Sequence, residues 1–244
     1  MAAAGRRIIV VLSPKGGTGK TTVSTHVAVG LARRRPDDVV LVDLDVAFGD
    51  VAPALLLDAR HGLLDVARGA APARHRSGVH VVAAPDTDEP LDLVADEELE
   101  HALDTVLSRY AIAVLDTGAG FDPVTRAAVQ RATDIVLVAS LDVPSLLALR
   151  KVMRWVDGLG QTGAVRHLVV NRATLLAGVE LADVGQTLGM QPDVEIPDDP
   201  AIALAVTAGV PLTEHDHEGG PPAVAAFERL LDRLTPAPRR PWRR

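Results

Sequence analysis

The chain has 244 residues, seven more acidic than basic residues, and no cysteine. This length fits one large domain, and almost half of the residues are apolar, which is enough for a sizeable core. The absence of cysteine excludes disulfides, thiol nucleophiles, iron–sulfur ligation and cysteine-based zinc sites. The first apolar run has about five residues, too short for a secretory signal or a membrane span, so we expect a cytoplasmic protein.

Six short runs rich in valine, isoleucine and leucine predict β-strands. None alternates polar with apolar residues, so each is expected to be buried on both faces, as in a parallel sheet covered by helices. The runs are Ile8–Leu12, Val39–Val42, Val79–Ala84, Ala111–Leu115, Ile135–Ala139 and Leu168–Val170, with a weaker seventh at Asp193–Ile196.

Stretches with helical spacing of apolar residues lie between these runs. The first carries Val23, Val27 and Leu31 on one face, and the others are Glu97–Arg109, Asp122–Ala132, Val143–Leu159, Val179–Leu188, Asp199–Ala208 and Ala223–Leu234. Alternating strands and helices predict an α/β fold with a doubly wound, mostly parallel sheet flanked by helices. We expect a single domain over residues 1–235, an irregular loop at Thr213–Pro222, and a disordered, basic, proline-rich tail over 236–244.

The chain uses 22 arginines but only three lysines, and two of these, Lys15 and Lys20, lie five apart in one glycine-rich loop. The loop separates the first predicted strand from the first predicted helix and reads Lys15-Gly16-Gly17-Thr18-Gly19-Lys20-Thr21-Thr22. Glycine frees backbone N–H groups to hold phosphate oxygens at the positive end of a helix.

Side chains of this loop fit a nucleoside triphosphate with magnesium. In a P-loop, Lys20 reaches the β- and γ-phosphates, Thr21 places a hydroxyl on Mg²⁺, and Thr22 reaches the α-phosphate. The generic pattern has glycine where this chain has Pro14, and a lysine follows. A lysine there can enter the nucleotide site of a second copy, as an arginine finger does in trans.

With its two lysines, the loop resembles the deviant Walker A motif of the ParA/MinD ATPase superfamily. Asp43-Leu44-Asp45 ends the second buried strand, at the edge of the sheet where ligands bind. The resemblance implies that Asp45 positions the attacking water and that Asp43 supports the Mg²⁺ shell.

A second acidic strand end resembles the Walker B element. Ala111–Leu115 is followed by Asp116, which would hold Mg²⁺ through water, and Gly118 then lets a backbone N–H approach the γ-phosphate. The family also implies a base-binding region: Asn171 and Arg172 would contact adenine, together with the loop at Pro197 and Asp198. ATP or ADP with Mg²⁺ is the expected ligand set.

The resemblance covers about residues 7–234 and implies a slow ATPase that forms a homodimer on ATP and localises a cellular machinery. Ser13-Pro14-Lys15 and the segment from Asp43 to Val51 are similar to the CpaE/TadZ pilus-localisation ATPases and to septum-site proteins, whereas Asp116–Gly120 looks more like the MinD and flagellar-number branch. A chromosome- or plasmid-partition ATPase of the same superfamily is an alternative.

Two alternatives belong to other classes. A P-loop ligase or synthetase for a small molecule would need a second polar pocket and leaves Lys15 unexplained, and a scaffold without turnover disagrees with intact Lys20, Asp45 and Asp116. The expected partners are a second copy and a protein cargo or activator. Peripheral contact with membrane or non-specific DNA stays open, through the arginine-rich tail around Trp242 or through basic helix faces.

Overall fold

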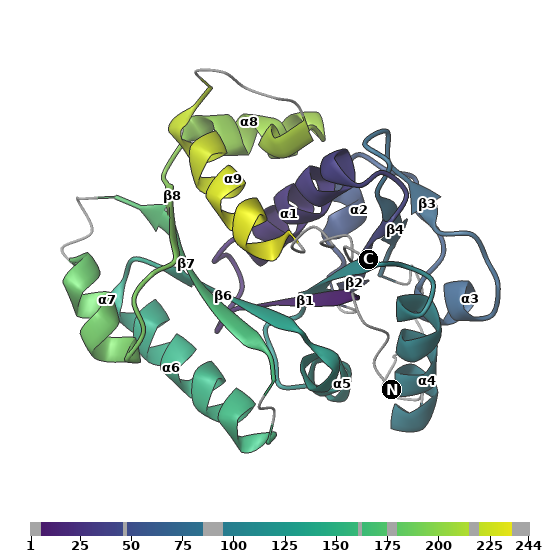
Figure 1. Cartoon of the computed structure of the whole chain (residues 1–244), viewed down its shortest axis with the longest axis horizontal. Helices are drawn as coiled ribbons and strands as arrows, with labels where there is room; N and C mark the ends of the chain where they lie inside the picture. Colours follow the sequence, from purple (N-terminus) through teal and green to yellow (C-terminus); the bar gives the residue numbers. More distant parts are fainter. Residues whose placement is uncertain are drawn as a thin grey trace, which may run out of the picture.

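The computed structural model describes residues 6–45, 48–84, 95–160, 163–174, 180–214 and 220–235. Within these residues, eight strands form one sheet in the order β3-β4-β2-β5-β1-β6-β7-β8 (Figure 1). Every neighbouring pair is parallel except β3 and β4. The strands are β1 (Arg7–Leu12), β2 (Val39–Leu44), β3 (Ala73–Arg74), β4 (His80–Val82), β5 (Ile112–Thr117), β6 (Asp134–Ser140), β7 (Val165–Ala173) and β8 (Val194–Pro197).

Helices cover both faces of this sheet (Figure 1). One face carries α1 (Lys20–Arg34), α2 (Val51–Ala54), α8 (Pro200–Ala208), the 3-10 turn η3 (Leu212–Glu214) and α9 (Pro222–Leu234). The other carries α3 (Leu63–Ala67), α4 (Asp96–Leu107), α5 (Pro123–Arg131), α6 (Val143–Gly158) and α7 (Leu181–Leu188). The described part of the chain contains no helix long and apolar enough to cross a membrane.

Successive residues of the central strands alternate between two aliphatic cores. Ile9 and Val11 pack in the core beneath α1 and α9, whereas Val10 and Leu12 pack in the core with α4 to α7. Side chains of a strand point to opposite faces in turn, so a strand covered on both faces must be apolar throughout. This explains why the predicted runs were continuous, and it confirms the predicted α/β architecture.

The seven predicted strands and the seven predicted helices are all present, but four short elements were not predicted: α2, α3, β3 and the 3-10 turn η3. The helices α2 and α3 and the two-residue strand β3 connect β2 to β4 and are too short to show a period in the sequence. The strand β7 is longer than predicted at both ends: it begins at Val165, and Asn171 and Arg172 lie inside it at an irregular step in its pairing with β8.

The predicted loop at Thr213–Pro222 is corrected at both ends. Thr213 is buried in η3, where its hydroxyl donates a hydrogen bond of 2.6 Å to the backbone oxygen of His26 on α1. The other end, Pro222, is the first residue of α9. Residues 215–219 and the predicted disordered tail at 236–244 lie outside the described residues, so the boundary at residue 235 stays a prediction.

Candidate nucleotide-binding site

The glycine-rich loop joins β1 to α1 and keeps its backbone open to the surroundings. Gly17 and Gly19 have φ angles of 76° and 93°, in the left-handed region that favours glycine. A Cβ atom on Gly19 would lie 2.2 Å from Nδ2 of Asn171, whereas one on Gly16 or Gly17 would meet nothing within 4 Å. The loop therefore packs tightly on β7 at Gly19 and exposes bare backbone at Gly16 and Gly17, where a phosphate can approach.

The N-terminus of α1 is suited to an anion. This helix has 15 residues, begins at Lys20, and has no acidic residue in its first turn, so its positive end is not neutralised from within. At its other end, Arg33 and Arg34 pair with Glu228 of α9. The helix is thus held by α9 and presents its free N–H groups toward the loop.

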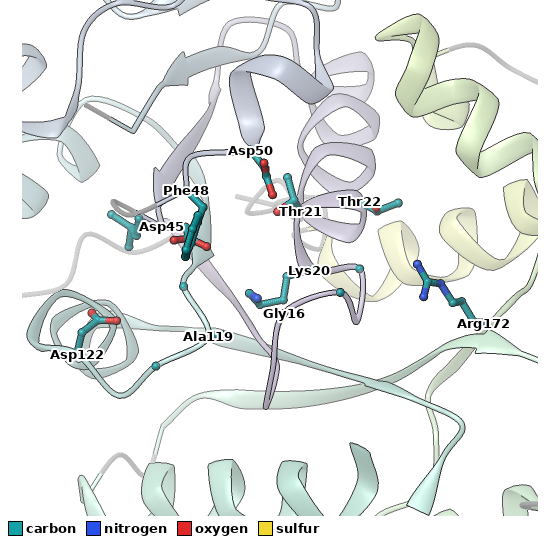
Figure 2. A pocket seen from close by; sticks show the side chains of 15 residues that line it. Gly16, Lys20, Thr21, Thr22, Asp45, Phe48, Asp50, Ala119, Asp122 and Arg172 are labelled. Atoms are coloured by element: carbon teal, nitrogen blue, oxygen red, sulfur yellow. The ribbon is translucent and has the colours of Figure 1, made fainter. Parts of the chain in front are cut away.

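A cavity of about 800 Å³ lies over the loop and the first turn of α1 (Figure 2). This volume is within the range of sites that hold a small ligand. Predicted residues line it: Gly16, Gly17, Gly19, Lys20, Thr21, Thr22, Asp45, Gly118 and Arg172. The lining residues that were not predicted are Leu44, Phe48, Asp50, Ala119, Gly120 and Asp122.

Asp116 lies behind the cavity and ties the first turn of α1 to the sheet. Its two carboxylate oxygens accept hydrogen bonds of 2.7 Å from the hydroxyls of Thr21 and Ser24. Ser24 was not predicted, although it lies one helical turn after Thr21, and that spacing is a signal that could have found it. Asp116 thus contacts the hydroxyl of Thr21, another of the three residues predicted at the magnesium site.

Two buried carboxylates face each other at the ends of neighbouring strands. Asp43 of β2 and Asp116 of β5 are register partners, and both are almost fully buried. Burial raises the pKa of Asp43 to about 7, helped by the charge of Asp116. Burial likewise raises the pKa of Asp116 to about 6, while Ser24, Thr21 and Lys20 act in the opposite direction. A divalent cation nearby would favour the charged form of both groups.

Asp43 also shapes the segment that leads to Asp45. Its oxygens accept hydrogen bonds of 3.0 Å from the backbone N–H groups of Asp45 and Val51. The side chain of Asp45 lies at the cavity beside Gly118, since a Cβ on that glycine would be 3.6 Å from Asp45 Oδ1 (Figure 2). The segments after β2 and β5 therefore meet at the mouth of the cavity. Val46 and Ala47 lie outside the described residues.

The two lysines of the loop have opposite environments. Lys20 is 7% exposed and lines the cavity. The side chain of Lys15 is 48% exposed, and its Nζ lies 3.6 Å from Oδ1 of Asp142, the residue before α6. Its backbone oxygen accepts hydrogen bonds from the hydroxyls of Ser13 and Thr18, so the backbone is fixed while the ammonium group faces outward.

The predicted base-binding residues lie in two places. Asn171 is buried and donates a 2.8 Å hydrogen bond from Nδ2 to the backbone oxygen of Thr18, which clamps the loop to β7. Arg172 has a φ of 52° and lines the cavity on the side of Thr22 (Figure 2). Pro197 pairs with Ala173, and Asp198 beyond it is exposed; neither lines the cavity. Contact of these residues with a base stays a prediction.

Two aspartates that were not predicted cap helices at the same edge of the sheet. Asp122 lines the cavity and accepts a 2.7 Å hydrogen bond from the N–H of Thr125 at the start of α5. Asp142 accepts an equally short bond from the N–H of Ser145 on α6. Each stands one or two residues before a proline, which is the sequence signal of a helix start.

The residues present fit a nucleoside triphosphate with Mg²⁺. The bare backbone at Gly16 and Gly17, the buried Lys20 and the helix terminus suit phosphate, and the two buried carboxylates, Asp43 and Asp116, suit a divalent cation. No group of three histidines or acids that could hold a metal occurs in the described ranges. Magnesium would therefore share Thr21 and Asp116 with water and nucleotide oxygens, as this ion prefers. Fold and cavity together define a P-loop nucleotide-binding protein.

Comparisons with known proteins agree with this class. Residues 5–88 match the ParA family described as the NUBPL iron-transfer P-loop NTPase. An uncharacterized ATP-binding protein of Methanocaldococcus jannaschii is 30% identical over 84% of this chain and 79% of its own length. The septum site-determining protein MinD of Thermotoga maritima is 23% identical over 93% of this chain and 87% of its own.

Solved structures show the same fold. MinD of Pyrococcus horikoshii, complexed with Mg-ADP, aligns with a TM-score of 0.80 at 22% identity over 94% of this chain and 96% of its own. A MinC:MinD complex of Aquifex aeolicus aligns with a TM-score of 0.78 at 21% identity over 93% and 95%. The chain belongs to the ParA/MinD family of P-loop ATPases. Iron transfer is not carried over, because the chain has no cysteine.

Proposed function

We propose that this chain is an ATP-driven positional switch, in which two copies meet face to face around bound ATP and separate after slow hydrolysis. Each Lys15 enters the nucleotide site of the other copy. The dimer recruits a protein cargo in the cytoplasm, and hydrolysis releases it. Such a switch needs a ligand that favours one state strongly, by about 5.5 kcal/mol to move a population from 1:99 to 99:1.

The outward position of Lys15 is the observation that supports this proposal best. A lysine that served its own nucleotide would lie in the cavity, as Lys20 does, whereas the ammonium group of Lys15 is half exposed and pairs only loosely with Asp142. An exposed ion pair contributes little, so its loss is a small barrier to a new partner. The terminal phosphate of a second copy's ATP is such a partner.

Within each site we assign the remaining roles as follows. Lys20 and the N–H groups of the loop bind the phosphates, and Thr21 and Asp116, with Asp43 behind them, hold Mg²⁺, which when bound draws negative charge from the γ-phosphate. Asp45 orients the attacking water at the mouth of the cavity, close to Gly118. Asn171, Arg172, Pro197 and Asp198 form the base side, and Asn171 couples it to the loop through Thr18.

The cargo is proposed from the relatives and from two segments of the sequence. The aligned MinD structure from Aquifex aeolicus is a complex with MinC, which supports a protein partner. Pro14 in the loop and Phe48-Gly49-Asp50 after β2 favour a pilus-localisation or septum-site role.

Replacing Lys15 tests the proposal. The oligomeric state of the purified chain is measured by light scattering with ADP, ATP and a non-hydrolysable ATP analogue. We expect a dimer with ATP and with the analogue, and a monomer with ADP. Lys15→Ala is expected to remain monomeric in all three, while its affinity for a fluorescent ATP analogue changes by less than about threefold, because the lysine lies outside its own cavity.

Three further variants make the result specific. Lys151→Ala, which alters the third lysine of the chain, should dimerise normally, whereas Lys20→Ala should lose nucleotide binding itself. Asp45→Ala should hold the dimer by slowing hydrolysis. If Lys15→Ala dimerises on ATP like the unmodified chain, the trans role of Lys15 is wrong.

A further inference from the structure

The hydroxyl of Ser24 is directed from α1 across to the sheet. A serine or threonine inside a helix commonly donates its hydroxyl hydrogen to a backbone oxygen about one turn earlier in the same helix. The next residue, Thr25, does this, with hydrogen bonds of 2.8 and 3.0 Å to the backbone oxygens of Thr21 and Thr22. Ser24 instead donates its hydrogen to Oδ1 of Asp116, 92 residues away, at 2.7 Å. Helix formation therefore does not explain this contact.

The two oxygens of Asp116 have different surroundings. Oδ2 accepts a hydrogen bond from the hydroxyl of Thr21, which lines the cavity (Figure 2). Oδ1 accepts one from Ser24, which is fully buried and does not line the cavity. Asp116 itself is 1% exposed. The carboxylate is thus fixed in one orientation, with Oδ2 on the side of the cavity and Oδ1 turned into the protein.

A carboxylate that offers a single oxygen suits magnesium better than calcium. Mg²⁺ requires near-ideal octahedral geometry and keeps several waters, whereas Ca²⁺ accepts bidentate carboxylates in a flexible shell. A carboxylate whose second oxygen is held by a buried hydroxyl cannot bind a cation with both oxygens unless that hydrogen bond breaks. Residues that hold a metal-binding group in this way orient it, and their loss weakens the site although they do not touch the metal.

We propose that Ser24 is a positioning residue that makes the nucleotide site selective for Mg²⁺ over Ca²⁺. It holds Oδ1 of Asp116, so that the carboxylate offers only Oδ2 to a cation or to the water around it. This inference rests on the proposed function, because it requires Mg²⁺ to bind with ATP beside Thr21 and Asp116. It goes further, because Ser24 lies outside the cavity and acts only through Asp116.

The test compares Ser24→Ala with Thr25→Val in the full-length chain. Thr25→Val is the matched control, because it removes the hydroxyl of the neighbouring buried residue and leaves both hydrogen bonds of Asp116 in place. A third variant, Ser24→Thr, keeps the hydroxyl. Binding of a fluorescent ATP analogue is titrated with Mg²⁺ and, separately, with Ca²⁺ at about pH 8.5, where Asp116 is charged. Circular dichroism and urea denaturation measure folding and stability.

We expect Ser24→Ala to raise the Mg²⁺ concentration for half-maximal binding of the analogue at least about tenfold, as the loss of a residue that orients a metal-binding group does. The corresponding Ca²⁺ concentration should change less than about threefold, because Ca²⁺ can use both oxygens of the released carboxylate. The preference for Mg²⁺ should therefore fall. Thr25→Val should leave both concentrations within about twofold, because its hydrogen bonds stay inside the helix. Ser24→Thr should restore the preference for Mg²⁺.

Three results would overturn the inference. If the unmodified chain needs Mg²⁺ for ATP binding and Ser24→Ala needs no more of it, Ser24 has no positioning role, while the proposed function stands. If Ser24→Ala loses affinity for both cations equally and is less stable in urea, Ser24 is a structural residue only. If the unmodified chain binds the analogue equally well with and without either cation, the inference fails together with the magnesium site of the proposed function.

Discussion

The sheet buries one aspartate at its amino edge, where the parallel strands begin, and another at its carboxyl edge, where they end. The two aspartates have opposite kinds of neighbours. Asp134, at the amino end of β6, accepts hydrogen bonds from Arg7 at 3.1 Å, His167 at 2.9 Å and the hydroxyl of Thr133 at 2.8 Å. Asp116, at the carboxyl end of β5, accepts hydrogen bonds only from hydroxyl groups, and its register partner on β2 is another carboxylate, Asp43. The charge of Lys20 offsets the effect of burial on the pKa of Asp116 only in part.

This difference in neighbours distinguishes an aspartate that stabilises the fold from one that serves a ligand. A buried charge that meets a basic group and has its oxygens satisfied holds elements together, whereas two buried carboxylates that face each other lower the stability of the empty protein. Such an arrangement persists where a ligand compensates it, and the carboxyl edge of a parallel sheet is where ligands bind. We therefore assign the amino edge to stability and the carboxyl edge to magnesium and nucleotide.

The largest effect is expected at the structural edge. Asp134→Ala leaves His167 and Arg7 without their acid, and breaking a buried pair in this way lowers the free energy of unfolding by about 3–5 kcal/mol. Nucleotide affinity, measured at a temperature where the variant is still folded, should stay unchanged, because the cavity lies at the other edge. Urea denaturation and binding of a fluorescent ATP analogue check the two parts.

A surface ion pair provides the control for that prediction. Asp157 pairs with Arg166 at 2.6 Å, but its side chain is 59% exposed. Asp157→Ala should therefore lower the free energy of unfolding by less than about 1 kcal/mol. If Asp134→Ala proves equally mild, the amino-edge cluster does not hold the sheet together and the comparison fails.

Asp116→Asn should raise the free energy of unfolding of the nucleotide-free protein, whereas Asp134→Ala lowers it. The pKa of Asp116 is about 6 in the folded protein and 3.8 in the unfolded chain. The free energy of unfolding therefore falls as pH rises from about 4 to 6, because the folded protein must then give up a proton that the unfolded chain has already lost. Removing it should raise the free energy of unfolding at pH 8 by up to about 3 kcal/mol. The magnesium-dependent part of ATP binding should disappear.

Urea denaturation at several pH values, with and without Mg-ATP, measures both effects. The gain in stability should shrink toward about pH 4, where the wild-type carboxyl is protonated in both states. A variant that is destabilised at pH 8 to the same degree as Asp134→Ala would show that Asp116 is a structural residue, and the proposed contrast between the two edges would be wrong.

Much of this site was predictable because its chemistry is local in the sequence. The loop from Lys15 to Thr22 has fixed spacing, and Asp43 and Asp116 stand at the ends of continuous apolar runs. In a parallel sheet those ends meet at one edge, so the order of strands and helices places them together. The number of major strands and helices followed from the same runs for the same reason.

Other features depend on contacts between segments far apart, and no local pattern carries them. Asn171 lies 153 residues from Thr18, to which it donates a hydrogen bond, and it stands at an irregular step in the pairing of β7 with β8. The Arg7–Asp134–His167 cluster joins three strands at their amino ends, where a single polar residue at the edge of an apolar run gives no sign of its partner. Lys15 likewise lies near a residue far away in the sequence, Asp142 at the start of α6, and no local pattern indicates this neighbour.

A third buried ionisable group sharpens the comparison, because it meets neither a counter-charge nor an expected ligand. His26 of α1 is fully buried and stacks on Phe227 with ring centroids 4.2 Å apart. Its Nδ1 lies 2.7 Å from the backbone oxygen of Thr22, and its Nε2 has no hydrogen-bond partner within the described residues. Burial lowers the pKa of His26 to about 4, so the ring stays neutral.

This arrangement predicts a loss of stability in mild acid, the smallest of the three effects. Below about pH 6.5 the unfolded chain is protonated at His26, whereas the folded protein binds this proton only below about pH 4. The free energy of unfolding should therefore fall by about 2 kcal/mol as pH is lowered from about 7.5 to 5. His26→Phe should remove that part of the pH dependence, whereas His101→Phe, at an exposed position on α4, should retain it. Because Asp43 and Asp116 titrate in the opposite direction in all three proteins, the difference between the curves isolates the histidine. Identical curves for His26→Phe and the unmodified chain would mean that the ring is charged, or reaches water, inside the fold.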